Sequence, residues 1–309
     1  MIDITSIAPE KFAIEGIDEA AGEFIGRPRI NYWKDAWRRL RQNKLALISM
    51  VILIFLIFMC MFAPAMSGYA FEEINSQSVN QRPSSVHWFG TDQLGRDMFA
   101  RVWVGGRVSL IIGFVTAIVA SVVGCLYGGI AAYFGGKVDM IMMRIQEIIA
   151  SIPYLIVVIL LSIVLQSKGL GTIILAMSIS AWTGIARLVR GQMLQLRSME
   201  FIMAAQGLGV KPGKIILRHM IPNMIGVVIV AVTFDIPTYI FGESFLSFIG
   251  LGVQPPNTSW GALAAMGHSK LIFYPYQLFF PTLMIALTML GFALFGDGLR
   301  DALDPRLRK

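Results

Sequence analysis

Charged side chains are scarce in this sequence. Only 15% of the 309 residues are Asp, Glu, Lys or Arg, against about a quarter in a typical soluble protein, whereas 56% are hydrophobic even without glycine. This composition excludes a disordered chain, because disorder requires low hydrophobicity and a high charge. Since a mean hydropathy of +0.67 is too high for a soluble fold, we expect much of the surface to face lipid.

Cysteine and histidine are equally rare. The two cysteines, Cys60 and Cys125, lie inside apolar runs, which excludes a disulfide scaffold and predicts free buried thiols. The three histidines, His87, His219 and His268, lie in separate segments without metal-ligand spacing. We therefore expect no metal site and no catalytic residue, and we expect that the chain is not an enzyme.

Long apolar runs dominate the rest of the chain. Five uncharged runs are long enough to cross a hydrocarbon layer of about 30 Å as helices. A sixth run contains two carboxylates, and we include it because it keeps the flanking basic loops on one side of the membrane. The six predicted spans are 45–63, 108–134, 148–165, 169–186, 224–248 and 271–295. The sequence thus predicts an all-α integral membrane protein, with the first run, preceded by 44 more polar residues, retained as an anchor.

Basic residues fix the predicted orientation. Six spans place both termini on the same side of the membrane, together with the second-to-third and fourth-to-fifth connections. These segments hold 20 of the 26 Lys and Arg residues. Because basic residues collect in cytoplasmic loops, we expect both termini to be cytoplasmic and the protein to be a multi-pass component of the cell (cytoplasmic, inner) membrane. The net charge of +7 then reflects topology, and no nucleic-acid partner is expected.

Local patterns add further expectations outside the spans. Residues 32–44 alternate Trp33, Trp37 and Leu40 with Lys and Arg, which predicts an amphipathic helix at the cytoplasmic membrane surface, in contact with lipid. In the long outer loop, two acid–base pairs at i,i+4 spacing are expected to face each other on a helix surface. These pairs are Asp92 with Arg96 and Asp97 with Arg101.

Small and kinking residues occur inside the predicted spans. Gly124 and Gly128 form a GxxxG pattern, which lets another helix approach closely. Three prolines, Pro153, Pro275 and Pro281, are each expected to remove a helical hydrogen bond and to kink a span.

Two carboxylates interrupt the predicted span 224–248. Asp235 and Glu243 are costly at membrane depth, so each is expected to face protein or a water-filled cavity. One interpretation makes them candidates for a translocation pathway. The other is that each carboxylate is satisfied by a hydrogen bond or an arginine from a neighbouring helix, and the sequence leaves both open.

Residues 199–222 contain a cluster of short side chains between two predicted spans. Gly209 is suited to end one short helix, Pro212 to begin a second, and Pro222 to open the next span. The small residues Ala204, Ala205, Gly207 and Gly209 are expected to leave one side of the first helix nearly flat. A partner protein can hold such a flat helix in a groove.

This segment resembles the cytoplasmic coupling loop of permease subunits of ATP-binding-cassette (ABC) importers, whose pattern is EAA-x3-G-x9-I-x-L-P. Ala204, Ala205, Gly209 and Pro222 match that pattern, whereas Met203 stands in place of its Glu and His219 in place of its first Ile. The ending from 218 to 223 resembles the oligopeptide and dipeptide branch of the family.

Other stretches resemble the C-type permease subunit of peptide importers. They are 38–48, 89–110, 243–261 and 296–308. On the extracytoplasmic side, the residues that carry this resemblance are Asp92, Gly95, Arg96, Asp97, Trp260 and Gly261. The resemblance divides the chain into a cytoplasmic tail with an amphipathic helix (1–44), a first span with an outer loop (45–107), a core permease domain (108–298) with a coupling loop (199–222), and a cytoplasmic tail (299–309).

The resemblance implies a type I ABC importer permease fold and a subunit that forms half of a translocation pathway for oligopeptides or dipeptides. It also implies a B-type permease, two cytoplasmic ATPases and an extracytoplasmic peptide-binding protein as partners. ATP and Mg are expected on the ATPases, because residues 207–215 lack the glycine and the Ser or Thr of a phosphate-binding loop. The alternative is an ion-coupled secondary transporter, which would be expected to show an internal repeat.

Overall fold

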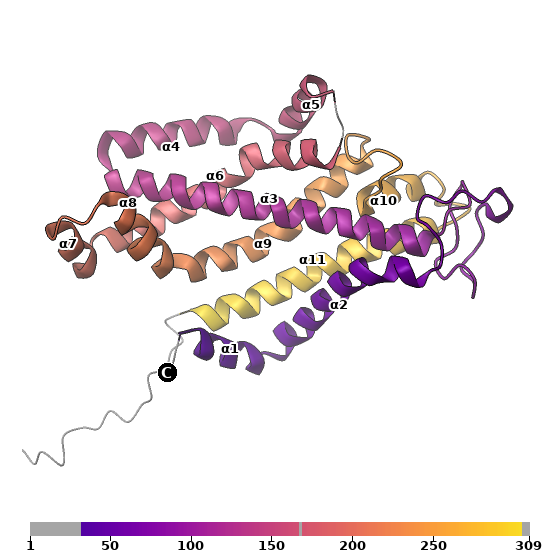
Figure 1. The fold of residues 1–309 in the computed structure, drawn as a ribbon, viewed down its shortest axis with the longest axis horizontal. Helices are drawn as coiled ribbons and strands as arrows, with labels where there is room; N and C mark the ends of the chain where they lie inside the picture. Colours follow the sequence, from indigo (N-terminus) through magenta and orange to yellow (C-terminus); the bar gives the residue numbers. More distant parts are fainter. Residues whose placement is uncertain (1–31, 167–168, 305–309) are drawn as a thin grey trace, which may run out of the picture.

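The computed structural model describes residues 32–166 and 169–304, and this part of the chain is helical without a β-strand. The terminal parts of the predicted tails, 1–31 and 305–309, lie outside it. The long helices lie side by side in an elongated bundle (Figure 1). The elements are α1 (Tyr32–Gln42), α2 (Lys44–Met66), η3 (Ser76–Ser78), α3 (Met98–Phe134), α4 (Gly136–Ser151), α5 (Tyr154–Val164), α6 (Leu170–Arg197), α7 (Glu200–Gly207), α8 (Pro212–Ile215), η4 (Ile216–Met220), α9 (Ile221–Phe248), α10 (Trp260–His268) and α11 (Tyr276–Leu303).

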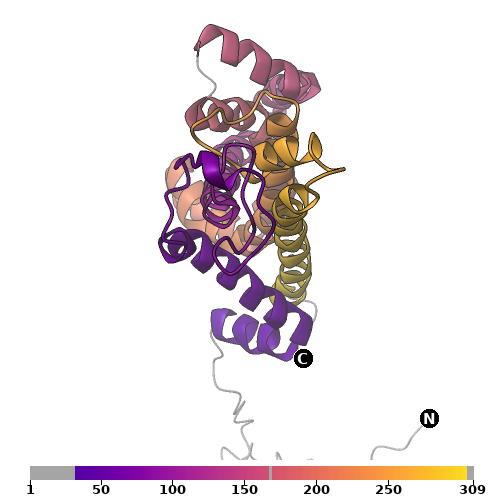
Figure 2. The same ribbon diagram turned by 90° about the vertical axis from the view of Figure 1, so that its right-hand side faces the viewer.

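The bundle has two different ends. Helices α7 and α8 lie at one end, with α1 and the last turn of α11. The loop 67–97 and α10 lie at the other end, which faces the viewer in Figure 2. We call these the α7 end and the α10 end.

Five helical segments are long and apolar enough to span a membrane, namely α2, α3, α6, the run from α8 through α9, and α11. The predicted span 148–165 is wrong as a single helix. Its residues belong to α4 and α5, which are bent by 80° and together make up to a sixth span. Pro153 immediately precedes α5 and has no N–H to donate, so the helical hydrogen-bond ladder breaks there.

Two other boundaries differ from the prediction. Helix α3 begins at Met98 rather than at 108, because Asp97 caps its first turn and the polar residues that follow it find partners inside the protein. Helix α11 begins at Tyr276 rather than at 271. Pro275 therefore precedes this helix, and only Pro281 lies within it.

Helix α3 packs most extensively against α6, and the predicted GxxxG pattern is confirmed at this contact. A Cβ on Gly124 would lie 2.7 Å from the Ile185 side chain, and one on Gly128 would lie 2.3 Å from the carbonyl oxygen of Ala186. Because both distances are well below normal contact, only glycine permits this approach of the two helices.

A proline inside α2 is compensated from α3. Pro64 has no N–H, so the carbonyl of Cys60 lacks its partner within the helix. The guanidinium of Arg107 donates to this carbonyl oxygen from Nε at 3.2 Å and from Nη2 at 3.1 Å. Arg107 thus satisfies the kink and fastens α2 to α3 at the same point.

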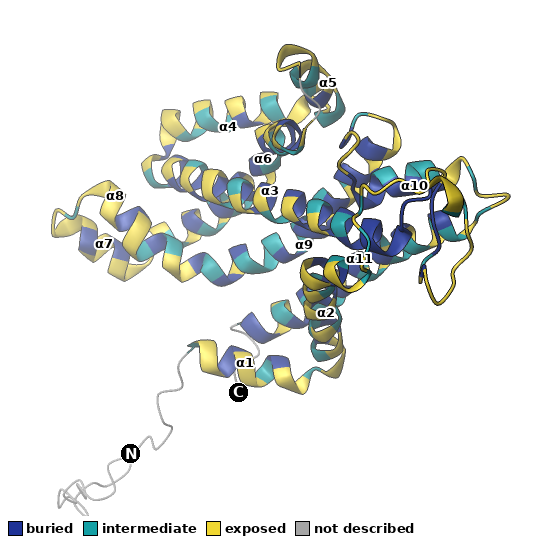
Figure 3. Cartoon of the chain, turned by 45° about the vertical axis from the view of Figure 1, so that its right-hand side comes forward, coloured by how far each residue is buried: buried dark blue, intermediate teal, exposed yellow. Residues whose placement is uncertain are grey.

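One face of α2 is apolar and exposed (Figure 3). Its residues recur every three or four positions, as one side of a helix does. They are Leu45, Ile48, Val51, Phe55, Phe58 and Phe62, each more than half exposed. Since the chain is a multi-pass membrane protein by its helices, this face is the natural lipid contact.

The predicted amphipathic helix is confirmed as α1. Ala36 and Leu40 are buried, and Leu40 belongs to a small apolar cluster with Ala302 of α11. The hydroxyl of Tyr32 also donates to the carbonyl oxygen of Leu303 at 3.3 Å. The position of α1 at a membrane surface stays a prediction.

Candidate functional site

The segment 199–222 forms the tip of the α7 end. Helix α7 ends in a Schellman motif: the N–H of Gly209 donates to Gln206 at 2.9 Å, and the N–H of Val210 donates to Ala205 at 3.1 Å. Gly209 has φ +72°, a conformation that disfavours residues with a Cβ. The predicted helix stop at Gly209 and the predicted start at Pro212 are therefore confirmed.

The two sides of α7 differ sharply in exposure. Ile202 is completely buried, packed in a cluster that includes Met193 and Ile215. On the outside Met203 is 52% exposed and Leu208 is 84% exposed. Of the four small residues expected on a flat side, Ala204, Gly207 and Gly209 are exposed, whereas Ala205 points into the protein.

The second short helix does not stand alone. Helix α8 continues through a single π-turn, η4, into α9, so the run from Pro212 to Phe248 is continuous. His219 lies in this π-turn and is partly buried, and Pro222, which has no N–H to donate, occupies the first turn of α9 directly after it. Single π-turns are frequent at functional sites because they displace one turn of a helix.

The α10 end contains the predicted motif residues of the loop 67–97. Asp92 accepts hydrogen bonds from the N–H groups of Leu94 at 2.8 Å and Arg96 at 3.0 Å, and from Nε of Arg96 at 2.7 Å. Gly95 has φ +74°, and a Cβ there would lie 1.8 Å from the carbonyl oxygen of Asn75. The Asp92–Arg96 pair exists, but in a buried tight turn rather than on a helix surface.

The second expected pair, Asp97 with Arg101, is wrong. Asp97 caps α3 through the N–H of Ala100 at 2.8 Å and also contacts Nδ1 of His87 at 2.9 Å. Arg101 turns instead toward Asp92, with its Nε 3.5 Å from the carboxylate, and donates to the carbonyl oxygen of Phe71 at 3.2 Å. The Asp97 carboxylate, which the i,i+4 spacing paired with Arg101, therefore caps the helix instead.

Glu243 lies in a buried polar cluster deeper in the bundle. Its carboxylate accepts from the hydroxyls of Ser247 at 2.6 Å and Ser109 at 2.8 Å, and the residue is fully buried. The hydroxyl of Ser259 lies 3.2 Å from that of Ser247. These hydrogen bonds are those of the second interpretation, in which a neighbouring helix satisfies the carboxylate, and a role of Glu243 in a pathway stays a prediction.

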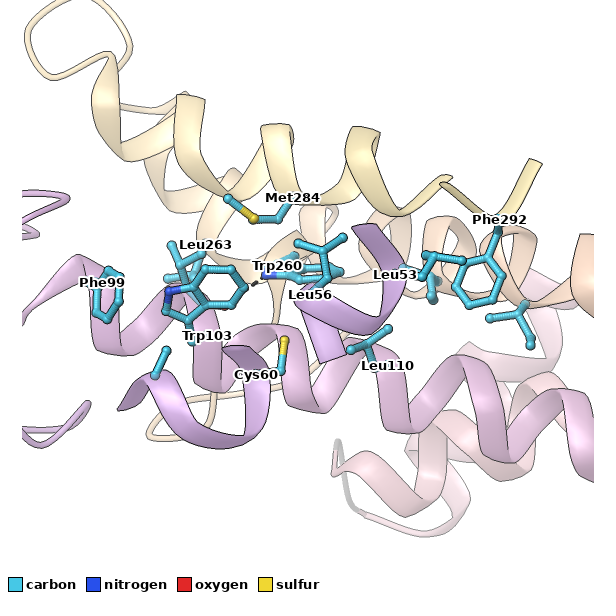
Figure 4. Packing of buried hydrophobic residues seen from close by; sticks show 14 of the residues in the cluster. Leu53, Leu56, Cys60, Phe99, Trp103, Leu110, Trp260, Leu263, Met284 and Phe292 are labelled. Carbon is cyan, nitrogen blue, oxygen red and sulfur yellow. Dashed lines mark hydrogen bonds between the residues drawn. The ribbon is translucent and has the colours of Figure 1, made fainter. Parts of the chain in front are cut away.

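Trp260 and Gly261 lie directly beside this cluster. The indole N–H of Trp260 donates to the carbonyl oxygen of Val102 at 2.9 Å, and its backbone N–H donates to Ser109 at 3.2 Å. Figure 4 shows the ring of Trp260 among Trp103, Leu263 and other apolar side chains. A Cβ on Gly261 would lie 2.4 Å from Cα of Ser244, so the start of α10 packs directly on α9.

Asp235 differs from Glu243 in its surroundings. It lies in the middle of α9, is partly exposed, and makes no hydrogen bond or ion pair with another residue in the described part of the chain. The neighbouring Thr238 and Phe241 are exposed on α9. Asp235 is thus a carboxylate at membrane depth that residues 32–166 and 169–304 leave unpaired.

Sequence patterns did not identify the partners of these residues. Ser247 follows Glu243 at i,i+4 on one helix, a signal that was available. Ser109 and Ser259 come from α3 and from the loop before α10, and His87 comes from a turn, so no spacing connects them to their partners. Cys60 and Cys125 are free and buried in different helices, as predicted.

Comparison with known proteins gives consistent matches. A family model described as "binding-protein-dependent transport system inner membrane component" matches residues 120–309. A second model, the N-terminal TM domain of oligopeptide transport permease C, matches residues 31–83.

Curated relatives match over nearly the whole chain. The oligopeptide transport system permease protein OppC of Bacillus subtilis is 48% identical, covering 93% of this chain and 94% of its own length. The dipeptide transport system permease protein DppC of the same organism is 45% identical, covering 98% and 95%. The Escherichia coli OppC is 44% identical, covering 89% and 92%.

A solved structure also matches. It is an inward-facing conformation of the MetNI methionine ABC transporter, with a TM-score of 0.55 and 20% identity, covering 67% of this chain and 98% of that chain. At this identity the likeness concerns the fold alone.

Proposed function

The chain belongs to the family of binding-protein-dependent transport system inner membrane components, and from this membership we propose that it is the permease subunit of an ATP-driven importer of oligopeptides or dipeptides. The observation that carries the proposal is the outer side of α7, where Met203 and Leu208 are exposed. The inner side of the same helix is buried against the bundle, so the exposed side chains are held in place. A membrane subunit needs an exposed surface of this kind, because the movements of an ATPase reach it only through a direct contact. An ion-coupled transporter gains no support from the family or from this exposed helix.

The proposed assembly contains this chain, a B-type permease, two cytoplasmic ATPases and an extracytoplasmic peptide-binding protein. ATP and Mg are held by the ATPases. We place the α7 end and both termini in the cytoplasm. Four exposed basic residues at that end support this orientation, because basic residues collect on the cytoplasmic side. They are Arg197, Lys211, Lys214 and Arg218.

Coupling is proposed to run through α7 into the bundle. The coupling loop comprises Met203, Ala204, Ala205, Gly207, Gly209, His219 and Pro222. The buried side of α7 packs against α6 and η4 through Ile202, Met193 and Ile216. A movement of the ATPases would therefore move α6 and α9 as well, which shifts the chain between two arrangements of its pathway.

Asp235 is proposed to face that pathway. A peptide carries an ammonium group, and an unpaired carboxylate in a poorly solvated passage attracts it. Asp235→Asn is expected to lower uptake of peptides with a free amino terminus by roughly 10- to 100-fold, since a contact with a charged group contributes roughly 1.5–3 kcal/mol. Uptake of N-acetylated peptides should change little.

The assembly is tested by tagging the chain in its native cell, extracting it in mild detergent, and measuring ATP hydrolysis and the co-purifying proteins. Recovery of a second permease with ATPases, and peptide uptake after reconstitution, is the expected result. Recovery of the chain alone under several extraction conditions would overturn the proposal. For Asp235, the matched control is Glu147→Gln, which removes an exposed carboxylate from α4 and should leave uptake unchanged.

A further inference from the structure

Helix α1 presents an unusual outward face. Trp33 is 49% exposed and Trp37 is 44% exposed, one turn apart. Arg41 continues this row, and its guanidinium lies 4.9 Å above the ring of Trp37. The opposite side of α1 is packed against α11 through Leu40, so the aromatic and cationic side chains are held outward.

This face carries an excess of positive charge. Residues 32–44 contain five basic side chains and one carboxylate, Asp35. Asp35 is paired with Arg38 at 2.8 Å and with Arg39 at 3.0 Å. Within the described residues, the other three basic side chains have no carboxylate partner; they are Lys34, Arg41 and Lys44.

The exposed row of α1 continues into the lipid-facing row of α2. The chain turns at Asn43, whose backbone is extended with φ −85° and ψ 100°, and α2 begins at Lys44. The next exposed residues are apolar, starting with Leu45 and Ile48. The exposed surface therefore changes at Lys44 from tryptophan and basic side chains to apolar side chains only. A membrane changes in the same order, from polar headgroups to hydrocarbon.

We propose that the exposed face of α1, formed by Trp33, Lys34, Trp37, Arg38, Arg41 and Lys44, binds the headgroups of anionic phospholipids. The two indoles lie at the depth of the headgroups, where amphipathic rings are favoured, and the unpaired cations contact the phosphates. Bound lipid holds α1 against the end of α11, beside the point where α9 begins. This inference depends only on the chain being a membrane protein, and it stands whether or not the proposed cargo is correct.

The experiment uses the full-length chain in lipid nanodiscs of phosphatidylcholine with a minor fraction of phosphatidylglycerol. One of the two lipids carries bromine on its acyl chains and quenches nearby tryptophan. The signal of α1 is the difference between the wild type and Trp33→Phe/Trp37→Phe, which preserves the other four tryptophans. The wild type is expected to show a strong preference for phosphatidylglycerol at α1.

The decisive variant is Arg41→Gln/Lys44→Gln. Each cation near an anionic surface is worth about fivefold in binding, so this preference should fall roughly 25-fold. Arg41→Lys/Lys44→Arg, which keeps the charge, should retain it. Lys137→Gln/Arg144→Gln removes two exposed cations from α4 and should leave it unchanged.

Three results would overturn the proposal. They are an unchanged preference in Arg41→Gln/Lys44→Gln, an equal loss in the α4 control, and displacement of the lipid by soluble glycerol phosphate, which would indicate a simple phosphate site. A variant that fails to fold would also shift the emission of the buried Trp103 and Trp260 to longer wavelength, which separates that outcome from a loss of lipid binding.

Discussion

The two ends of the bundle differ in how they bury and expose their side chains. The α10 end buries charged side chains and pairs them with one another: Asp92 is 5% exposed and accepts four contacts from its own turn and from Arg101. The α7 end fixes only the inner side of its helix and leaves Leu208 84% exposed. Large apolar side chains are exposed at both ends, for example Ile74 at 62% in the loop 67–97, so exposure alone does not separate the two ends. What distinguishes them is the set of buried ion pairs, which the α10 end has around Asp92, whereas the exposed side of α7 belongs to the coupling loop for which we propose docking.

The largest expected effect on the free energy of unfolding is at Asp92, in the α10 end. Asp92→Ala leaves the guanidinium groups of Arg96 and Arg101 buried without a carboxylate, which is expected to cost about 3–5 kcal/mol in the free energy of unfolding. Thermal unfolding in detergent or nanodiscs measures it. Glu72→Ala, an exposed carboxylate in the same loop, is the control and should change stability by less than about 0.5 kcal/mol. Equal stability of the two variants would refute the account of this end.

The buried cluster around Glu243 gives the next effect. Glu243→Ala leaves the hydroxyls of Ser109 and Ser247 without their acceptor, at an expected cost of about 1–3 kcal/mol for each unsatisfied group. Glu243→Gln keeps an acceptor oxygen and should cost less than the alanine variant. The same unfolding measurement compares them, and a Gln variant as unstable as the Ala variant would show that charge, rather than hydrogen bonding, matters there.

A substitution at Gly209 tests the coupling role that we propose for the α7 end. Gly209→Asp adds a Cβ at φ +72°, for which we expect roughly 1–2 kcal/mol of strain, and a charge on the docking face. Membrane insertion should persist while transport is uncoupled from ATP hydrolysis. Gly68→Asp, at φ +73° with open space around a Cβ in the loop 67–97, is the matched control for the strain and the charge and should keep transport coupled. Normal peptide uptake in Gly209→Asp would contradict the proposed coupling role.

The smallest effect on stability is expected at Leu208. Because its side chain is almost fully exposed, Leu208→Ser should change the free energy of unfolding by no more than about 0.5 kcal/mol. Ile202→Ser, on the buried side of the same helix, should destabilise the protein strongly, since it buries a hydroxyl and removes packing. Unfolding curves that fail to separate these variants would show that α7 is not anchored as described.

The sequence predicted the helical class, the contact at Gly124 and Gly128, and the Gly209 stop, because each depends on local chemistry or on residue size. It did not predict the 80° bend between α4 and α5: Pro153 marks a break, but the surrounding packing determines the angle. It also misassigned Asp97, because the competition between capping a helix and pairing with Arg101 depends on where the loop places His87. Local sequence signals therefore predicted where the helices lie. The hydrogen-bond and ion-pair partners of the site residues come from distant parts of the sequence, so the sequence did not predict them.

The central claim, that the α7 end is a docking surface, is tested most directly by counting the ATPase subunits that co-purify with Leu208→Ser. Ile74→Ser is the matched control, since Ile74 is 62% exposed at the α10 end. The account predicts that Leu208→Ser loses the ATPases while the permease partner stays, and that Ile74→Ser keeps both. Recovery of ATPases with Leu208→Ser in wild-type proportion would contradict it.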